Sequence, residues 1–249
     1  MLMRSAGDGR SREATLGRPY GTAGTPQGVA LVLPSGAARG AGRPTRRSVA
    51  AVAALARCLA RRGRSDALGV HVVRYRVRGW NDSAADPVRD ASWALDEVVR
   101  RHGDVPVSLI GVDMGARAAL RASGHPAVVS VVALEPWLPG EAVATEPVKQ
   151  LSGRRVLLVH GTDDERTDPE LSYRLAERVK KANREVCRFE VHSDAHGLGG
   201  HRAEVMALTA DFVLGSLFER DFARPVADAL AAPPPLGLRM PLAVGFGGR

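Results

Sequence analysis

Short apolar runs and amphipathic segments alternate along most of the chain. Six runs rich in valine and leucine lead into polar or turn-forming residues, which is typical of buried strands; they are "GVALVLP" (28–34), "LGVHVVRY" (68–75), "VPVSLIGV" (105–112), "AVVSVVAL" (127–134), "RRVLLVHG" (154–161) and "EVCRFEVH" (185–192). Between them apolar residues recur at helical spacing, which predicts helices over residues 46–62, 87–102, 114–122, 169–182 and 201–219. Strand and helix patterns therefore alternate through the middle of the chain.

This alternation predicts an α/β fold with a mostly parallel sheet covered by helices on both faces, because the crossovers between parallel strands carry helices back over the sheet. We expect one domain over residues 26–219. Residues 1–25 are rich in Gly, Arg, Ser and Thr and are predicted to be mobile. Residues 220–249 are predicted to form a Pro/Gly-rich C-terminal tail, in which "AAPPPLG" disfavours regular structure.

Composition and charge exclude several classes of function. The formal net charge is +8, but the basic residues are almost all arginines spread among acidic residues, so we expect no nucleic-acid partner. The sequence contains no run of about 18 apolar residues, so we expect neither a signal peptide nor a membrane partner. Neither a Walker loop nor Gly-x-Gly-x-x-Gly after the first strand occurs, and no cofactor is predicted. Cys58 and Cys187 lack Cys-x-x-Cys spacing, which is typical of reduced thiols in a cytoplasmic protein.

Candidate chemistry follows three of the predicted strands. Asp113 stands at the apex of a Gly-x-Asp-x-Gly turn, "GVDMGAR", between a buried strand and a helix. Asp163 and Asp164 lie in "HGTDDERTDP" after a later strand, and His196 lies in "SDAHG" after the last one. In parallel sheets the reactive groups gather beyond the carboxyl ends of the strands, so we expect these side chains to meet.

With this order of apex residue, acid and histidine, the sequence resembles the α/β-hydrolase fold superfamily, in particular its small bacterial members that lack a large lid, which are dienelactone-hydrolase-like or lysophospholipase-like. The resemblance covers about residues 27–218. It implies that Asp113 occupies the nucleophile position, where serine is usual, with Asp164 as the acid and His196 as the base. Asp163 is the alternative acid. The resemblance also implies an oxyanion hole built from two backbone amides. One is the amide of Met114, and the other is that of Gly36 or Ala37, in the loop that contains "LPSG".

Each of these residues also has an ordinary structural interpretation. Asp113 is positioned to cap the helix that follows it, Asp164 to cap a turn, and His196 to be a plain loop histidine. A second grouping is a metal site with nitrogen and oxygen ligands from His192, Asp194, His196 and His201. Because alternating positions near a strand end point to opposite faces, these ligands converge only if the loop turns back, and we predict no metal.

An aspartate nucleophile favours one kind of substrate. Asp113 is ionised near neutral pH; its attack on an acyl carbonyl gives a high-energy anhydride, whereas its attack on an alkyl carbon gives an ordinary ester. Relatives with aspartate at this position include epoxide hydrolases and haloalkane dehalogenases, in which the histidine activates the water that cleaves the ester. Those relatives carry a helical cap after the strand that corresponds to residues 127–134, and residues 135–153 are too few for one. Trp80 and Trp137 are the candidates for covering the site instead.

Two functions remain open from the sequence. The first is a hydrolase of a small-molecule substrate that uses Asp113, Asp164 and His196, by an alkyl-ester route or by an atypical general-base route. The second is a catalytically silent binding or regulatory protein of the same fold, in which Asp113 pairs with His196 and stabilises the imidazolium.

Overall fold

Nine strands form one mostly parallel sheet within residues 13–21 and 24–248, the part of the chain that the computed structural model describes. In spatial order the strands are β1 (Thr15–Leu16), β4 (Leu68–Arg74), β3 (Gly28–Leu33), β5 (Val107–Val112), β6 (Val128–Leu134), β7 (Arg155–Gly161), β8 (Val186–Val191) and β9 (Met240–Pro241), and β2 (Tyr20–Gly21) also pairs with β4. Neighbours from β4 to β9 are parallel, whereas β1 and β2 run antiparallel to β4. The predicted strands are all present, and the predicted α/β fold class is confirmed.

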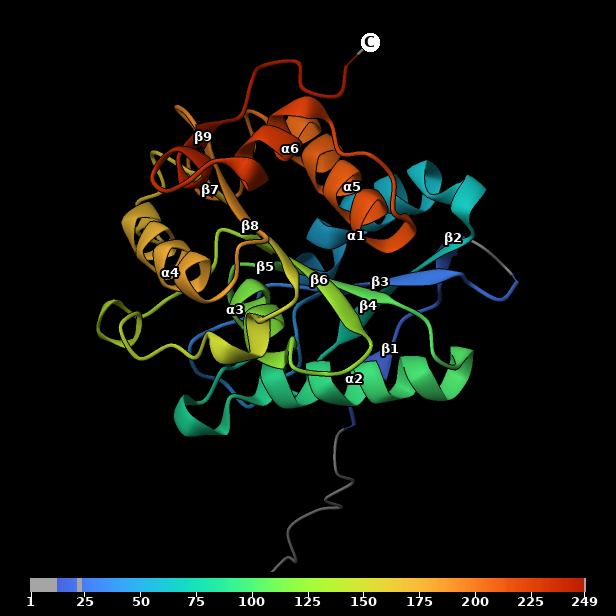
Figure 1. Ribbon diagram of the computed structural model, residues 1–249. Helices are drawn as coiled ribbons and strands as arrows, with labels where there is room; N and C mark the ends of the chain where they lie inside the picture. The colour runs from blue at the N-terminus through green and yellow to red at the C-terminus, as the bar shows by residue number, and fades with distance from the viewer. Residues whose placement is uncertain (1–12, 22–23, 249) are drawn as a thin grey trace, which may run out of the picture.

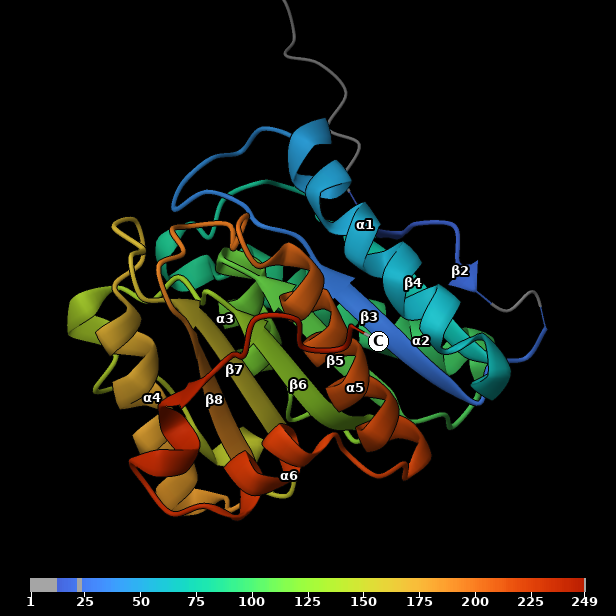
Figure 2. The same ribbon diagram turned by 90° about the horizontal axis from the view of Figure 1, so that it is seen from above.

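Helices cover both faces of the sheet, as Figure 1 and Figure 2 show. One layer contains α1 (Arg46–Arg62), α5 (Arg202–Phe218) and α6 (Arg224–Ala231); the other contains α2 (Asp86–His102), α3 (Met114–Ala122) and α4 (Pro169–Ala182). Among the helices of the described residues, none is both long enough and apolar enough to cross a bilayer.

The strands are almost wholly apolar because both of their faces are buried. In β3, Val29 and Leu31 point into the core beneath α2, α3 and α4, whereas Ala30 and Val32 point into the core beneath α1 and α5. This alternation divides the interior into two apolar layers with the sheet between them. Because β5, β6, β7 and β8 are parallel neighbours, their carboxyl ends lie side by side, and the loops that leave them share one edge of the sheet.

The ends of the described chain differ from the expected mobile segments. Within the predicted N-terminal segment, β1 and β2 pair with β4, while residues 1–12 and 22–23 lie outside the described residues. In the predicted C-terminal tail, α6 begins with proline in its first turn and β9 extends the sheet beside β8. The reason is burial: Val226, Ala229 and Leu242 of this region pack into the core layer beneath α1 and α5. The proline run only separates α6 from β9.

The turn between β5 and α3 is tight enough to require glycine on both sides of Asp113. A Cβ atom on Gly111 would lie 2.2 Å from the Gly115 carbonyl oxygen, and one on Gly115 would lie 2.3 Å from that of Leu33. At the apex, Asp113 has φ 55° and ψ −117°, a conformation that a residue with a side chain rarely adopts. The packing around the turn therefore holds the Asp113 backbone in a strained geometry.

We expect Gly115→Ala to lower the free energy of unfolding by at least about 2 kcal/mol, because the added methyl group meets backbone atoms that cannot rotate away. Urea unfolding followed by circular dichroism measures the change. Gly140→Ala is the matched control, since a Cβ atom there meets nothing within 4 Å. Equal unfolding midpoints for the two variants would contradict this account of the turn.

Candidate active site

Four loops at the carboxyl edge of the sheet bring acidic groups and a histidine together. Asp113 follows β5, Glu135 follows β6, Asp164 follows β7 and His196 follows β8. Asp113, Glu135 and His196 line one cavity of about 390 Å³, and Asp164 lies behind the histidine ring. The apolar walls of the cavity come mainly from α1 and α5, through Val52, Leu55, Val205 and Met206. We call this space the catalytic cavity.

Asp164 holds the histidine. Its carboxylate lies 2.9 Å from His196 Nδ1 and also accepts hydrogen bonds from the Thr167 hydroxyl and from the amides of Arg166 and Thr167. Burial alone would raise the pKa of Asp164, but the bonds from Thr167, His196 and Arg166 outweigh it and lower the pKa to about 2. An ionised carboxylate only accepts, so His196 Nδ1 is the donor. In the neutral imidazole, Nε2 is then the atom able to take up a proton.

Asp163, the alternative acid, is directed elsewhere. Its side chain is exposed and accepts a hydrogen bond of 2.9 Å from the Thr162 hydroxyl. Of the two neighbours in this loop, Asp164 is therefore the one that contacts His196.

A second histidine, His160, is buried beside Asp164 and stabilises the loop that contains it. His160 Nε2 donates to the Thr167 carbonyl oxygen at 2.8 Å and lies 3.3 Å from Asp164 Oδ2. Burial lowers the pKa of His160 to about 4 despite the bond to Thr167. The ring is therefore neutral near pH 7 and acts as a structural support of the Asp164 loop.

Asp113 is buried, and its carboxylate faces an arginine. Arg166 Nη2 lies 3.3 Å from Asp113 Oδ2, and only 3% of the Asp113 residue surface is exposed. Burial raises the pKa of Asp113 above its ordinary value, whereas Arg166 and His196 act in the opposite direction. The Asp113 side chain makes no capping bond to α3. Within the described residues, no direct hydrogen bond joins Asp113 to His196, although both line the catalytic cavity.

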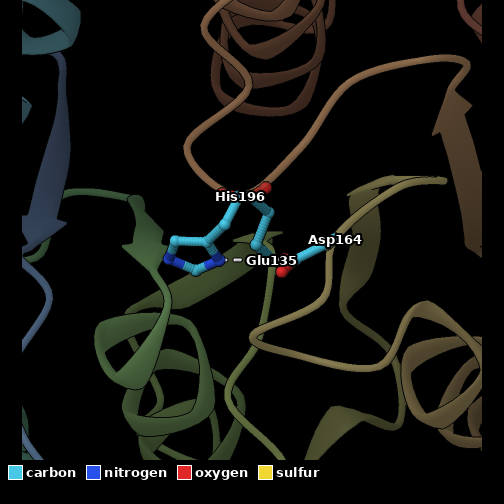
Figure 3. A group of neighbouring side chains, drawn as sticks. All are labelled: Glu135, Asp164 and His196. Atoms are coloured by element: carbon cyan, nitrogen blue, oxygen red, sulfur yellow. Dashed lines mark hydrogen bonds and ion pairs between the residues drawn. The ribbon is translucent and has the colours of Figure 1, made fainter.

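Glu135 belongs to the same group, as Figure 3 shows. Its two carboxylate oxygens lie 3.0 and 2.8 Å from the amide nitrogen of Gly197, next to the histidine, and its backbone has φ 46°. Burial raises the pKa of Glu135 to about 7, with Asp164 and Asp113 adding to the rise against Gly197 and His196. Glu135 is not among the site residues predicted from the sequence. The sequence pattern that could have identified it is an acidic residue directly after a buried strand, which is the pattern that identified Asp113.

Glu135, Asp164 and His196 are also able to offer metal ligands, since one atom from each lies within 4.8 Å of the others. The oxygens of Asp164 already accept four hydrogen bonds, so this group is arranged as a hydrogen-bonded acid–base network. The other grouping considered from the sequence, His192, Asp194, His196 and His201, does not come together among the described residues. His192 is exposed, and Asp194 accepts bonds from the ring and amide of His201 at the start of α5.

The predicted oxyanion residues have different surroundings. The Met114 amide lies near the Asp113 carboxylate and helps to lower the pKa of Asp113. The Ala37 amide is already used, because it donates to the Arg78 carbonyl oxygen at 2.8 Å. Gly36 packs on the Met114 side chain, and a Cβ atom there would lie 2.8 Å from the Met114 sulfur.

Trp80 and Trp137 do not line the catalytic cavity. Their rings lie edge to face with centroids 5.9 Å apart, and the Arg117 guanidinium lies 4.4 Å from the Trp80 centroid. Arg117 also pairs with the buried Glu146 carboxylate at 2.8 Å. These contacts anchor the loop between β6 and β7 to α3. That loop contains two short 3-10 turns, Gly140–Ala142 and Lys149–Leu151, in place of a helical cap.

Neither a protein-family model nor a curated protein sequence matches the chain, but solved structures do. The monoacylglycerol lipase of Paleococcus ferrophilus has a TM-score of 0.52 at 17% identity, covering 80% of this chain and 99% of that one. An esterase of Pyrococcus furiosus has a TM-score of 0.58 at 15% identity, with coverages of 77% and 83%. An α/β serine hydrolase homologue from Coxiella burnetii has a TM-score of 0.56 at 16% identity, with coverages of 79% and 89%. At such low sequence identities, the structural similarity shows only that the backbones are arranged alike. On that basis the chain has the α/β-hydrolase fold.

Proposed function

We propose that the protein is a hydrolase of small organic substrates in which Asp113 attacks an alkyl carbon and His196 activates the water that releases the product. One observation carries this proposal. The strained turn directs the Asp113 carboxylate into the cavity lined by His196, whose Nδ1 is held by Asp164. A carboxylate that only capped a helix would require neither this backbone conformation nor this cavity.

The first step forms an ester. One oxygen of Asp113 bonds to the alkyl carbon, the bond from that carbon to the leaving group breaks, and the leaving group departs with the bonding electrons. With an epoxide, the ring oxygen is the leaving group and takes a proton from solvent. This step needs no base, because the nucleophile is already ionised.

The second step cleaves the ester. His196 Nε2 removes a proton from water as the oxygen of that water adds to the ester carbonyl carbon of Asp113. The tetrahedral intermediate collapses, the acyl carbon–oxygen bond breaks, and the alcohol leaves with the proton held by His196. Asp113 is restored with one oxygen from water, and its carboxyl group returns the remaining proton of that water to solvent. One water is consumed in each case: an epoxide becomes a diol that keeps the ring oxygen, and a haloalkane becomes an alcohol with release of the halide ion and one proton.

The ion pair between Arg166 and Asp113 favours a second candidate, a silent binding protein of the same fold. The Arg166 guanidinium neutralises the carboxylate at 3.3 Å, and a permanent pair of this kind lowers its nucleophilicity. In that case a ligand binds in the catalytic cavity without reacting.

Isotope labelling tests the proposed function. In a single turnover of an epoxide or haloalkane panel in ¹⁸O-water, we expect the label in the peptide that contains Asp113 and unlabelled oxygen in the alcohol product. The Asp113→Asn variant should neither turn over nor take up label. Label found first in the product would indicate direct attack by water, and ligand binding without turnover across the panel would favour the silent candidate.

A further inference from the structure

The catalytic cavity opens beside a second cavity that carries a strong positive charge. This second cavity, about 410 Å³ in volume, shares Ser35, Ala51 and Arg166 with the catalytic cavity. It adds Arg47 from the first turn of α1 and Arg78 from the segment after β4. No acidic residue lines it within the described part of the chain. We call this space the arginine cavity.

Two of the three arginines of the arginine cavity have no acidic partner among the described residues. Across the described residues, neither Arg47 nor Arg78 forms an ion pair, whereas Arg166 pairs with Asp113. The first turn of α1 contains no acidic residue. A cation at that end of a helix is unfavourable, because the unpaired amides there already carry partial positive charge. Three arginines in one cavity are consistent with a site that is completed by an anion.

The walls of the catalytic cavity complement that site with apolar surface. Val52 and Leu55 face it from α1, and Val205 and Met206 face it from α5. Asp113 lines the catalytic cavity and pairs with Arg166, which lines both cavities. A molecule that spans the two cavities therefore needs an apolar part at one end and an anionic group at the other, with its reactive carbon near Asp113.

We infer that the substrate is an amphipathic anion, whose carboxylate or phosphate head group binds Arg47, Arg78 and Arg166 while its apolar chain fills the catalytic cavity. This inference rests on the proposed function for the reacting atoms only; the binding site itself is independent of the reaction.

Arg166 links binding of the head group to the nucleophile. It lines both cavities, its side chain is 62% exposed, and its guanidinium pairs with Asp113. A head group in the arginine cavity competes with Asp113 for this guanidinium, and the carboxylate that loses its partner is the better nucleophile. An anionic substrate thus frees the group that attacks it, whereas a neutral substrate leaves the ion pair intact.

Calorimetric binding tests the arginine cavity without any turnover. The probes are octanoate, octyl phosphate and the neutral 1-octanol, which share one chain length and lack an electrophilic carbon. We expect at least one of the two anions to bind at least about tenfold more tightly than the alcohol. Arg47→Gln/Arg78→Gln should remove that advantage. The control is Arg57→Gln/Arg61→Gln, which takes the same charge from exposed positions of α1 outside both cavities and should keep it.

Kinetics test the link to catalysis with a medium-chain fatty acid that carries an epoxide in its chain near the carboxylate, and with the primary amide of that acid. We expect kcat/KM to favour the carboxylate by roughly tenfold or more, and the ratio to approach one in Arg47→Gln/Arg78→Gln. Equal binding of anions and alcohol, or an anion preference that this variant retains, would overturn the inference even if the epoxides are hydrolysed. Anion binding that depends on these arginines, without turnover of any electrophile, would instead leave the inference standing and remove the proposed reaction.

Discussion

The His196→Gln variant is expected to stop after the first chemical step and to accumulate a covalent ester on Asp113. Alkylation of the carboxylate requires no base, whereas hydrolysis of the ester requires a proton acceptor on the attacking water. Steady-state turnover should fall by about 10³-fold, because loss of a general base typically costs 10²- to 10⁴-fold. Mass spectrometry of the intact protein after incubation with an epoxide panel measures the adduct, and peptide mapping assigns it to the segment "GVDMGAR".

Two controls make this outcome specific. The double variant Asp113→Asn/His196→Gln lacks the nucleophile and should form no adduct. His192→Gln removes an exposed histidine of the same loop and should behave as the wild type. Glutamine keeps an amide that is able to donate to Asp164, so the loop should stay folded. A folded His196→Gln protein that gains no mass with any electrophile would contradict the ester mechanism and favour the silent binding protein.

The sequence was sufficient for the sheet because its central strands are buried on both faces. Runs such as 107–112 and 128–134 are apolar at nearly every position, which leaves few alternatives to a parallel sheet between helices. The glycines at 111 and 115 likewise predicted the tight turn, since the close backbone contacts there exclude a side chain. These features depend on residues that are close together in the chain, so they can be predicted from a single sequence.

The C-terminal region differed from expectation because its short elements depend on tertiary contacts. The α6 helix spans only Arg224–Ala231 and is followed by consecutive prolines, so its local pattern resembles a tail. Its stability comes from burying Val226 and Ala229, a gain that no local window reveals. The same holds for β9, which pairs with a strand about fifty residues earlier in the chain.

Parts of the site were also beyond local patterns. Arg166 pairs with Asp113 across 53 residues, and Glu135 meets Gly197 across 62 residues. The tryptophans show the limit most clearly. An aromatic residue in a loop at the sheet edge is able to face either the cavity or the scaffold, and the ion pair between Arg117 and Glu146 draws Trp80 and Trp137 to the scaffold. Only the assembled fold distinguishes these outcomes.

Asp113→Ser is expected to convert the protein into a better esterase than the wild type. A serine hydroxyl at the apex would give an acyl-enzyme ester, whereas the native carboxylate gives a high-energy anhydride with the same substrate. The required partners are already assembled, since Asp164 holds His196 Nδ1 and leaves Nε2 to take the hydroxyl proton. The substitution also frees Arg166 from its ion pair and removes the carboxylate beside the Met114 amide.

The size of this gain depends on the oxyanion hole. The Met114 amide becomes available to the developing oxyanion, but the Ala37 amide stays bonded to the Arg78 carbonyl oxygen, so Gly36 is the remaining second donor. We therefore expect hydrolysis of p-nitrophenyl acetate to rise by about 10²-fold over a slow wild type, at the lower end of what such base catalysis supplies. Asp113→Ala should show no gain, because it lacks a hydroxyl, and Asp113→Ser/His196→Gln should lose the gain, because it lacks the base. A wild type that is already a fast esterase, and that keeps its rate in Asp113→Ala, would mean that the residue at the apex of the turn is not the nucleophile.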